Sequence, residues 1–259
     1  MTVRTFLSAS LGLLTLAISA SAGTIYIAND TQTPITVYTT GGTFVQNFGQ
    51  GGATGVAVDA TGNVWTVAAG FGNNVVKKYD AAQNVLATFT AVINGNWVED
   101  ASHGAGNTLW LGTFEGNIFA VNDLTGAIIS SFAVANSTFT GVAFDGTNLW
   151  ASGGLTSKNL FKYSTSGTLL STFALADTCG GVGYDVSDNT LYCGDFGVVR
   201  HYSTSGVLLG SFSTSSGAYH DGLETPNLGV YSSVPEPTSL LLIGTGLLGL
   251  VGVARRKKQ

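Results

Sequence analysis

Methionine, cysteine, proline and charged residues are all scarce in this sequence. Its 259 residues include one methionine, two cysteines and four prolines, and charged residues make up 10% of the chain. Two cysteines alone are too few for a structural zinc site, which takes four ligands. Glycine occurs 36 times, and Ser, Thr, Asn and aromatic residues are frequent. This composition favours many short strands joined by turns over helices.

Basic residues are especially rare between the two ends of the chain. Residues 23–233 have the length of one domain and contain five basic against fourteen acidic side chains, a formal charge of −9. Such a surface repels phosphate backbones and excludes nucleic acid as a partner. It would instead attract divalent cations or cationic partners. The five basic residues are Lys77, Lys78, Lys158, Lys162 and Arg200.

The first 22 residues have the three parts of a secretory signal peptide. Arg4 supplies a positive start, an apolar run covers residues 6–18, and Ala20 and Ala22 flank Ser21 in an A-x-A cleavage pattern. The apolar run is shorter than the roughly 20 residues needed to span a bilayer. We therefore predict removal of residues 1–22 by signal peptidase, with cleavage after Ala22.

The other end carries a processing motif, an apolar run and a basic tail. Pro235, Glu236 and Pro237 form the motif, within residues 234–237. The two prolines keep it extended, so that an enzyme can reach it. Residues 238–254 are uncharged and long enough for a short membrane helix, and residues 255–258 are all Arg or Lys. The basic tail would stay in the cytoplasm.

Residues 234–259 resemble the PEP-CTERM sorting signal of exported bacterial proteins, which combines these three parts in this order. The resemblance implies a Gram-negative bacterium and recognition by an exosortase-type sorting enzyme. It also implies anchoring in the inner membrane during sorting, followed by transfer to the cell surface or the extracellular matrix.

The middle of the chain is an internal repeat. Five stretches, typified by residues 163–173 and 202–212, end on a phenylalanine, and the steps between these phenylalanines are 41, 43, 41 and 39 residues. A period near 40 residues indicates propeller blades or another stacked array. The five residues are Phe48, Phe89, Phe132, Phe173 and Phe212.

Each repeat predicts four short antiparallel strands. Gly141 opens a first strand that ends on Asp145, Trp150 lies in the second, Tyr163 in the third, and Phe173 ends the fourth. Four strands in about 40 residues make one β-propeller blade. The repeats resemble the broad NHL and YVTN class of propeller repeats, which is degenerate in sequence and carries no activity of its own.

The chain begins at a second-strand position, because Tyr26 aligns with Trp65, and the segment after His220 aligns with a first strand. The last strand could therefore complete the first blade and close the ring. We predict an all-β, five-bladed propeller over residues 23–233. Residues 228–231 look like one further second strand, so a six-bladed ring with an incomplete blade is the alternative.

Acidic and histidine side chains interrupt the repeat just before two of the blade-opening positions. In a propeller these positions approach the mouth of the central channel, where such side chains could bind Ca²⁺ or another divalent cation, or form an acid–base pair. They could equally be solvated residues of a loop rim. The candidate residues are Trp97, Glu99, Asp100, His103, His220, Asp221 and Glu224.

Cys179 and Cys193 lie in one repeat, on either side of an expected hairpin. In an oxidising compartment such a pair can form a disulfide, although two small buried thiols would also fit.

Two functions stay open at this point. The first is a non-catalytic surface or matrix protein whose loops bind an exopolysaccharide or a matrix protein, without a cofactor. The alternative is an extracytoplasmic lyase or hydrolase that uses the acidic and histidine residues. No serine-hydrolase elbow, zinc-protease motif or phosphate-binding loop occurs in the sequence.

Overall fold

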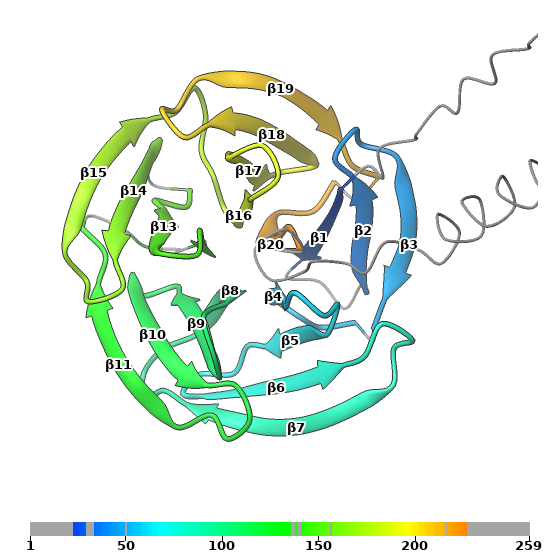
Figure 1. Cartoon of the computed structure of the whole chain (residues 1–259), viewed down its shortest axis with the longest axis vertical. Helices are drawn as coiled ribbons and strands as arrows, with labels where there is room; N and C mark the ends of the chain where they lie inside the picture. Colours follow the sequence, from blue (N-terminus) through cyan, green and yellow to red (C-terminus); the bar gives the residue numbers. More distant parts are fainter. Residues whose placement is uncertain are drawn as a thin grey trace, which may run out of the picture.

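Five four-stranded sheets surround a central axis like the blades of a wheel (Figure 1). The computed structural model describes residues 23–29, 34–49, 51–135, 138, 141–155, 157–215 and 217–226. Within these ranges every regular element is a β-strand, and none of the described segments is a helix that could cross a membrane. The predicted signal peptide, sorting segment and strand at 228–231 lie outside the described residues.

The strands follow the same order in all five blades, from the axis outward. Blade 1 contains β20 (His220–Glu224), β1 (Thr24–Asn29), β2 (Ile35–Thr39) and β3 (Phe44–Phe48). Blade 2 contains β4 (Gly55–Val58), β5 (Val64–Ala68), β6 (Asn73–Tyr79) and β7 (Val85–Val92). Blade 3 contains β8 (Val98–His103), β9 (Thr108–Thr113), β10 (Asn117–Asn122) and β11 (Ile128–Ala133). Blade 4 contains β12 (Val142–Phe144), β13 (Asn148–Ser152), β14 (Asn159–Ser164) and β15 (Leu169–Ala174). Blade 5 contains β16 (Val182–Asp185), β17 (Thr190–Asp195), β18 (Val198–Ser203) and β19 (Leu208–Ser213).

The ring closes by pairing the last strand with the first. β20 runs antiparallel to β1, with Glu224 opposite Tyr26 and Leu223 opposite Ile27. The predicted five-bladed ring is thus confirmed, and the six-bladed alternative is wrong. Because every blade is complete between Thr24 and Glu224, this part of the chain contains a whole propeller.

The hydrophobic core consists of five clusters, one between each pair of neighbouring blades. The second strands supply its largest members: Trp65, Trp110, Trp150 and Tyr192 are all buried. Each such side chain stabilises the fold by about 1.5–3 kcal/mol through burial alone. Each blade has two apolar faces, and it can bury both of them only when it packs between two other blades. This requirement favours a closed ring.

The third and fourth strands of every blade are joined by a short hairpin, which is one residue longer in blade 3, and the same bulge follows it in all five. Gly167 and Gly206 have φ of 85° and 84° in two of these turns, a conformation open to glycine because it lacks a Cβ. In each fourth strand the second residue is an extra one that opposes no residue of the third strand. The bulged residues are Val45, Leu86, Ile129, Leu170 and Leu209.

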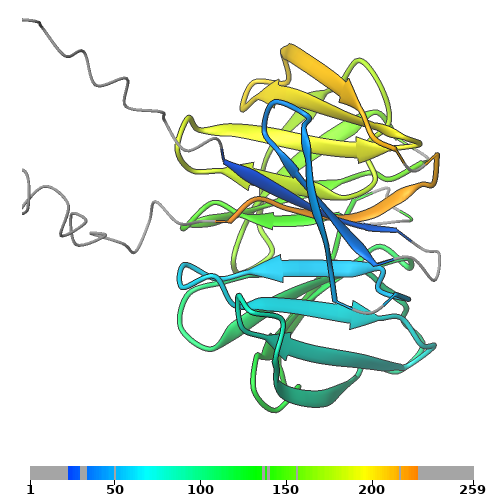
Figure 2. The same ribbon diagram turned by 90° about the vertical axis from the view of Figure 1, so that its right-hand side faces the viewer.

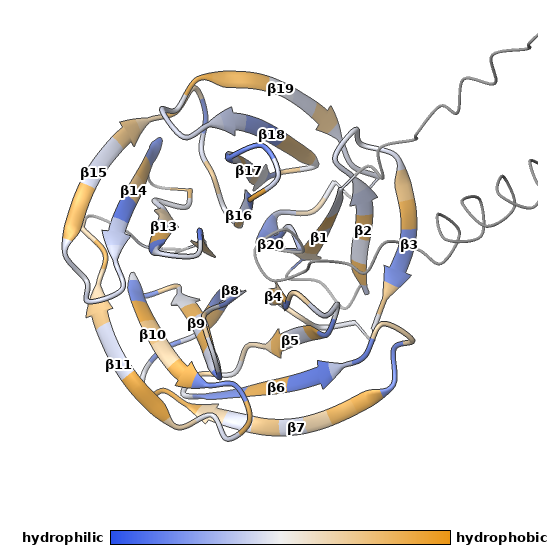
Figure 3. Cartoon of the chain, viewed as in Figure 1, coloured by the Kyte–Doolittle hydropathy of each residue, from blue (hydrophilic) through white to orange (hydrophobic). Residues whose placement is uncertain are grey.

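The two sides of the disc differ. β1 starts and β20 ends on the same side (Figure 2), which we call the terminus face. It also carries the turns between first and second strands and between third and fourth strands. The opposite side, the loop face, carries the connections from second to third strands and from each blade to the next. Apolar residues colour much of the outer strands, on the rim of the disc (Figure 3).

Candidate functional site

The central axis is occupied by the carboxylate of Asp100. Its Oδ1 accepts hydrogen bonds from the backbone N–H groups of Ala101 (2.8 Å) and Leu223 (3.2 Å). Its Oδ2 accepts from those of Val142 (3.0 Å) and Val182 (3.2 Å). The four donors come from the innermost strands of four different blades. Asp100 therefore ties the blades together at the centre of the wheel.

A β-bulge at Glu99 precedes this contact. Val98 opposes Thr113 and Asp100 opposes Gly112, so Glu99 is an extra residue at the start of β8. Bulges re-aim the side chains that follow them. Ser102, two residues after Asp100, contacts the neighbouring blade 4, where its Oγ accepts a hydrogen bond from the N–H of Phe144 at 3.0 Å.

Glu224 is a second fully buried carboxyl group close to the axis. By strand register it occupies the place of Ala57, Ala143 and Gly183 in other blades. Neither of its carboxyl oxygens has a hydrogen-bond partner of ordinary geometry among the described residues. Burial, followed by the charge of Asp100, raises the pKa of Glu224 well above its usual range, although the Ser102 hydroxyl opposes this shift.

Burial also dominates at Asp100 itself. It raises the pKa of the Asp100 carboxyl well above the ordinary value, while the four backbone N–H groups act in the opposite direction. Because all four neighbours are donors, the geometry suits an acceptor at both oxygens. The group therefore has a structural role, and its lone pairs point at backbone rather than toward a ligand.

His220 lies between blades and is fully buried. Its ring packs against Gly194, where an added Cβ would meet the His220 Cβ at 2.6 Å. Its Nε2 lies 3.1 Å from Thr214 Oγ1. Burial lowers the pKa of His220 to about 4, against the charge of Asp195. The imidazole is thus neutral at physiological pH.

Asp221 and Glu99 are buried near the loop-face end of the axis. The ring of Tyr219 lies there too, since an added Cβ at Gly180 would come within 2.5 Å of its hydroxyl oxygen. Burial and the charges of Asp221 and Asp195 raise the pKa of Tyr219. Asp221 and Glu99 are thus buried side chains at this end of the axis, and Tyr219 beside them is half-buried.

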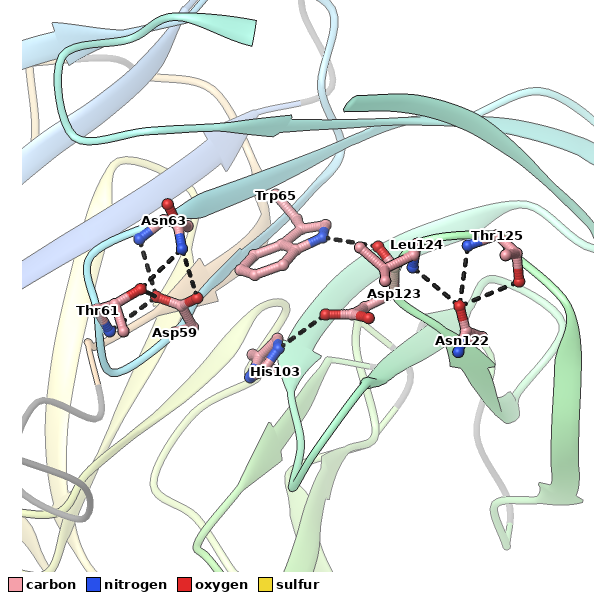
Figure 4. Close-up of polar contacts among 9 residues, drawn as sticks. All are labelled: Asp59, Thr61, Asn63, Trp65, His103, Asn122, Asp123, Leu124 and Thr125. Atoms are coloured by element: carbon pink, nitrogen blue, oxygen red, sulfur yellow. Dashed lines mark hydrogen bonds and ion pairs between the residues drawn. The ribbon is translucent and has the colours of Figure 1, made fainter. Parts of the chain in front are cut away.

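His103 is the last residue of β8, and its side chain contacts Asp123 beside Trp65 (Figure 4). Its Nε2 is 3.3 Å from Asp123 Oδ2, and its ring centroid is 4.6 Å from that of Trp65. The Trp65 indole donates a hydrogen bond to the Asp123 carbonyl oxygen at 3.2 Å. His103 thus joins blades 2 and 3 near the terminus face.

The structure therefore divides the predicted cluster among several places. Asp100 and Glu224 are on the axis, His220 and His103 are between different blades, and Trp97 is exposed on the loop face. In the described part of the chain, no three His, Cys, Asp or Glu side chains come together as metal ligands.

The two cysteines form a disulfide. Cys179, which precedes β16, is bonded to Cys193 of β17, and their Cα atoms are 5.1 Å apart. Both are fully buried beside Val182 and Leu191. The disulfide thus fixes the end of the connection from blade 4 to blade 5, just before the innermost strand of blade 5 begins.

The loop face presents a set of exposed apolar side chains that the sequence analysis did not single out. Phe71, Phe114, Leu155 and Phe196 each lie in the turn between a second and a third strand, and they are 64%, 40%, 38% and 59% exposed. A sequence signal exists, because each follows the second-strand aromatic by four to six residues. Trp97, which the sequence analysis did predict, is 46% exposed in the connection from β7 to β8.

Trp97 is held on a rigid support. Its backbone N–H donates to Glu115 Oε2 at 2.9 Å, and its carbonyl accepts from the Phe114 N–H at 2.9 Å. The Trp97 and Phe71 ring centroids are 6.2 Å apart. We call Phe71, Trp97 and Phe114 the aromatic platform.

Amide side chains border the platform. Asn96 Oδ1 accepts hydrogen bonds from Asn117 Nδ2 (3.0 Å) and Thr113 Oγ1 (3.1 Å). Asn74 Oδ1 accepts from the N–H groups of Gly70 (3.2 Å) and Val98 (3.1 Å). The loops that carry the three aromatic rings are thus fixed before any ligand arrives.

The fold and its closure define the class: this protein is a five-bladed β-propeller. The family of the PEP-CTERM protein-sorting motif matches residues 233–258. The chain is therefore, more particularly, an exported propeller with a PEP-CTERM sorting motif, which implies exosortase processing and membrane-anchored sorting.

Two solved structures are similar to this chain at low identity. One, described as "Crystal Structure of Mitotic Checkpoint Complex", has 12% identity and a TM-score of 0.47 over 65% of this chain and 53% of the other. This chain thus spans about half the length of that one. The second is a protein of unknown function from Bacteroides caccae, with 13% identity and a TM-score of 0.47 over 74% and 73% of the two chains. No curated protein matches the sequence.

Proposed function

We propose that this protein is a non-catalytic surface or matrix propeller that binds an extracellular polysaccharide through its loop face. The observation that carries the proposal is the aromatic platform, with three exposed rings on hydrogen-bonded loops. Aromatic rings on a fixed support offer large contact areas at low entropic cost, and sugar rings can stack on them.

The position of the platform supports this function. The described part of the chain ends just after β20, on the terminus face, and the sorting segment follows it in the sequence. The platform is on the opposite face. A chain held by its C-terminus would therefore present the platform away from its attachment point, toward the surrounding matrix.

The polar groups around the platform are amides, hydroxyls and one carboxylate. Asn94 and Glu115 are exposed beside the rings, and Asn96 and Asn117 are partly exposed. Amides and carboxylates accept and donate hydrogen bonds as sugar hydroxyls require. A neutral or cationic polysaccharide fits this set better than an acidic one, since the domain carries a formal charge of −9.

The enzymatic alternative receives no support from the arrangement of its candidate residues. An acid–base pair must lie within hydrogen-bond reach of one substrate atom. Asp100 accepts four backbone hydrogen bonds instead, and His220 is buried between blades with its Nε2 beside Thr214.

The test is retention of residues 23–233 on the exopolysaccharide of the producing cells, measured by affinity electrophoresis. Trp97→Ala should weaken retention by about 5- to 30-fold, because one lost stacking contact corresponds to about 1–2 kcal/mol, and the double variant Phe71→Ala/Phe114→Ala, which loses two contacts, should weaken it by about 30-fold or more. Phe196→Ala, which removes an exposed ring on another blade, is the matched control and should retain wild-type binding.

Unchanged retention of the Trp97 and Phe71/Phe114 variants would overturn the platform as the binding site. If the wild type were not retained but captured a protein from the extracted matrix, the polysaccharide would be the wrong ligand and a protein partner the right one.

A further inference from the structure

The outermost strands of the five blades form an uncharged rim. β3, β7, β11, β15 and β19 contain no Asp, Glu, Lys, Arg or Pro. Each has one edge that faces away from the ring, because each is the last strand of its sheet. Natural proteins usually protect such edges with charges or proline, since an unprotected edge invites pairing with another chain.

Every rim strand also begins with two exposed apolar residues. The second residue of each pair is the bulged one, and it interrupts the usual alternation of side chains between the two faces of the strand. These residues are between 45% and 58% exposed. The pairs, which we call the apolar doublets, are Phe44 and Val45, Val85 and Leu86, Ile128 and Ile129, Leu169 and Leu170, and Leu208 and Leu209.

We propose that this rim is a self-association surface, and that its partner is the rim of a second copy of this chain. The apolar doublets lie where each fourth strand starts, at the same level near the terminus face in all five blades. Two copies that stand side by side in the same orientation would therefore bring doublet against doublet, related by a two-fold axis parallel to the axis of the wheel.

The exit of the chain favours this partner. β20 is the innermost strand of its blade and ends on the terminus face, so the described part of the chain ends away from the rim. Copies held by C-terminal segments in one membrane share one orientation, which puts their rims at one height. The rim carries one apolar doublet on each of five blades, and the rim of a second copy carries the same five. Each copy can therefore contact more than one neighbour.

Charge argues for the same partner. The domain as a whole is acidic, so copies repel one another least where no charge is present. A bilayer is a poorer partner, because the turns on the terminus face contain aspartates. Asp80 and Asp123 lie in turns that directly precede doublets, and Asp59, Asp145 and Asp188 lie in turns between first and second strands.

One rim contact buries two doublets, which is less than a stable interface in solution requires. Association should therefore need tethering, which raises the effective concentration of neighbouring copies. The matching experiment uses residues 23–259 inserted in phosphatidylcholine vesicles, with donor and acceptor dyes on the amino group of Gly23 in separate copies. Energy transfer is measured at a fixed surface density.

We expect transfer at least twofold above that of randomly placed copies. A rim variant with lysine at Val45, Leu86, Ile129, Leu170 and Leu209 should fall to the random value. The charge-matched control carries lysine at exposed turn positions, namely Ala81, Ala82, Ala105, Ser166 and Ser205, and should keep the wild-type transfer. Thermal unfolding of both variants verifies that the propeller is intact.

Random transfer by the wild type, or equal transfer by the wild type and a folded rim variant, would overturn the proposal. Rim-dependent binding of residues 23–233 to plain vesicles would overturn it as well, because the rim would then bind lipid. Loss of polysaccharide binding by the platform variants leaves this outcome untouched, since the platform is on the opposite side from the doublets.

Discussion

Replacement of Asp100 by alanine should remove the contact that joins four blades at the axis. Four backbone N–H groups, at 2.8, 3.2, 3.0 and 3.2 Å from the carboxylate, would lose their acceptor. A buried donor without an acceptor costs about 1–3 kcal/mol, so four of them set an upper range of about 4–12 kcal/mol.

Water that enters the vacated space will recover part of this loss, and we expect Asp100→Ala to lower the free energy of unfolding by about 4 kcal/mol. That is a large share of the roughly 5–15 kcal/mol that stabilises a domain. The midpoint of thermal unfolding should fall by about 8–16 °C, because 1 kcal/mol shifts a domain of this size by about 2–4 °C.

Asp100→Asn separates the acceptor role from side-chain size. Asparagine has nearly the same shape, but its amide places two N–H donors against backbone N–H groups, so we expect a loss of at least about 2 kcal/mol. Asp177→Asn is the control for loss of a charge, since Asp177 is half exposed and its ion pairs with Lys158 and Arg200 are worth at most about 1 kcal/mol.

The assay is urea denaturation of residues 23–233 at pH 7, followed by tryptophan fluorescence. If Asp100→Asn or Asp100→Ala unfolded within 1 kcal/mol of the wild type, the blades would not depend on this carboxylate, and the reasoning would be refuted.

Three further predictions concern other parts of the chain. Burial raises the pKa of Glu224, so ionisation of this carboxyl group destabilises the folded state once the pH exceeds the unfolded pKa of about 4.5. Glu224→Gln should therefore raise the free energy of unfolding by about 1 kcal/mol or more at pH 8 and leave it unchanged below pH 4.5. Denaturation curves that show an equal increase at both pH values would contradict this. A Cys179→Ala/Cys193→Ala variant, which lacks the disulfide, should have a free energy of unfolding about 3 kcal/mol lower than the wild type, the value for a loop of this length. In unfolding curves, reducing agent should lower the midpoint of the wild type and leave that of the variant unchanged. Alanine at residues 235–237 should leave the chain intact to Gln259 in a host with the sorting enzyme; mass spectrometry of extracted protein showing normal processing of this variant would argue against the motif.

The sequence by itself determined the repeat and hence the fold. Residues such as Trp150 and Phe173 recur because every blade meets the same neighbours and needs the same side chains at the same depth. The alignment of Tyr26 with Trp65 likewise determined the closure, because the first blade lacked one strand that the end of the chain could supply. The sorting motif at residues 235–237 is linear and also needs no tertiary structure to be identified.

Only the tertiary structure decided what the unusual polar residues do. Sequence position placed Asp100 and His103 in one candidate cluster, yet the structure separates them: Asp100 lies on the axis, whereas His103, the last residue of β8, packs against Trp65. Whether a side chain points to the axis or to a neighbouring blade depends on the bulge at Glu99, and a bulge shows only in strand register. The aromatic platform was hidden for a related reason: Phe71, Trp97 and Phe114 come from three separate loops, and only the stacking of blades brings those loops together on one face.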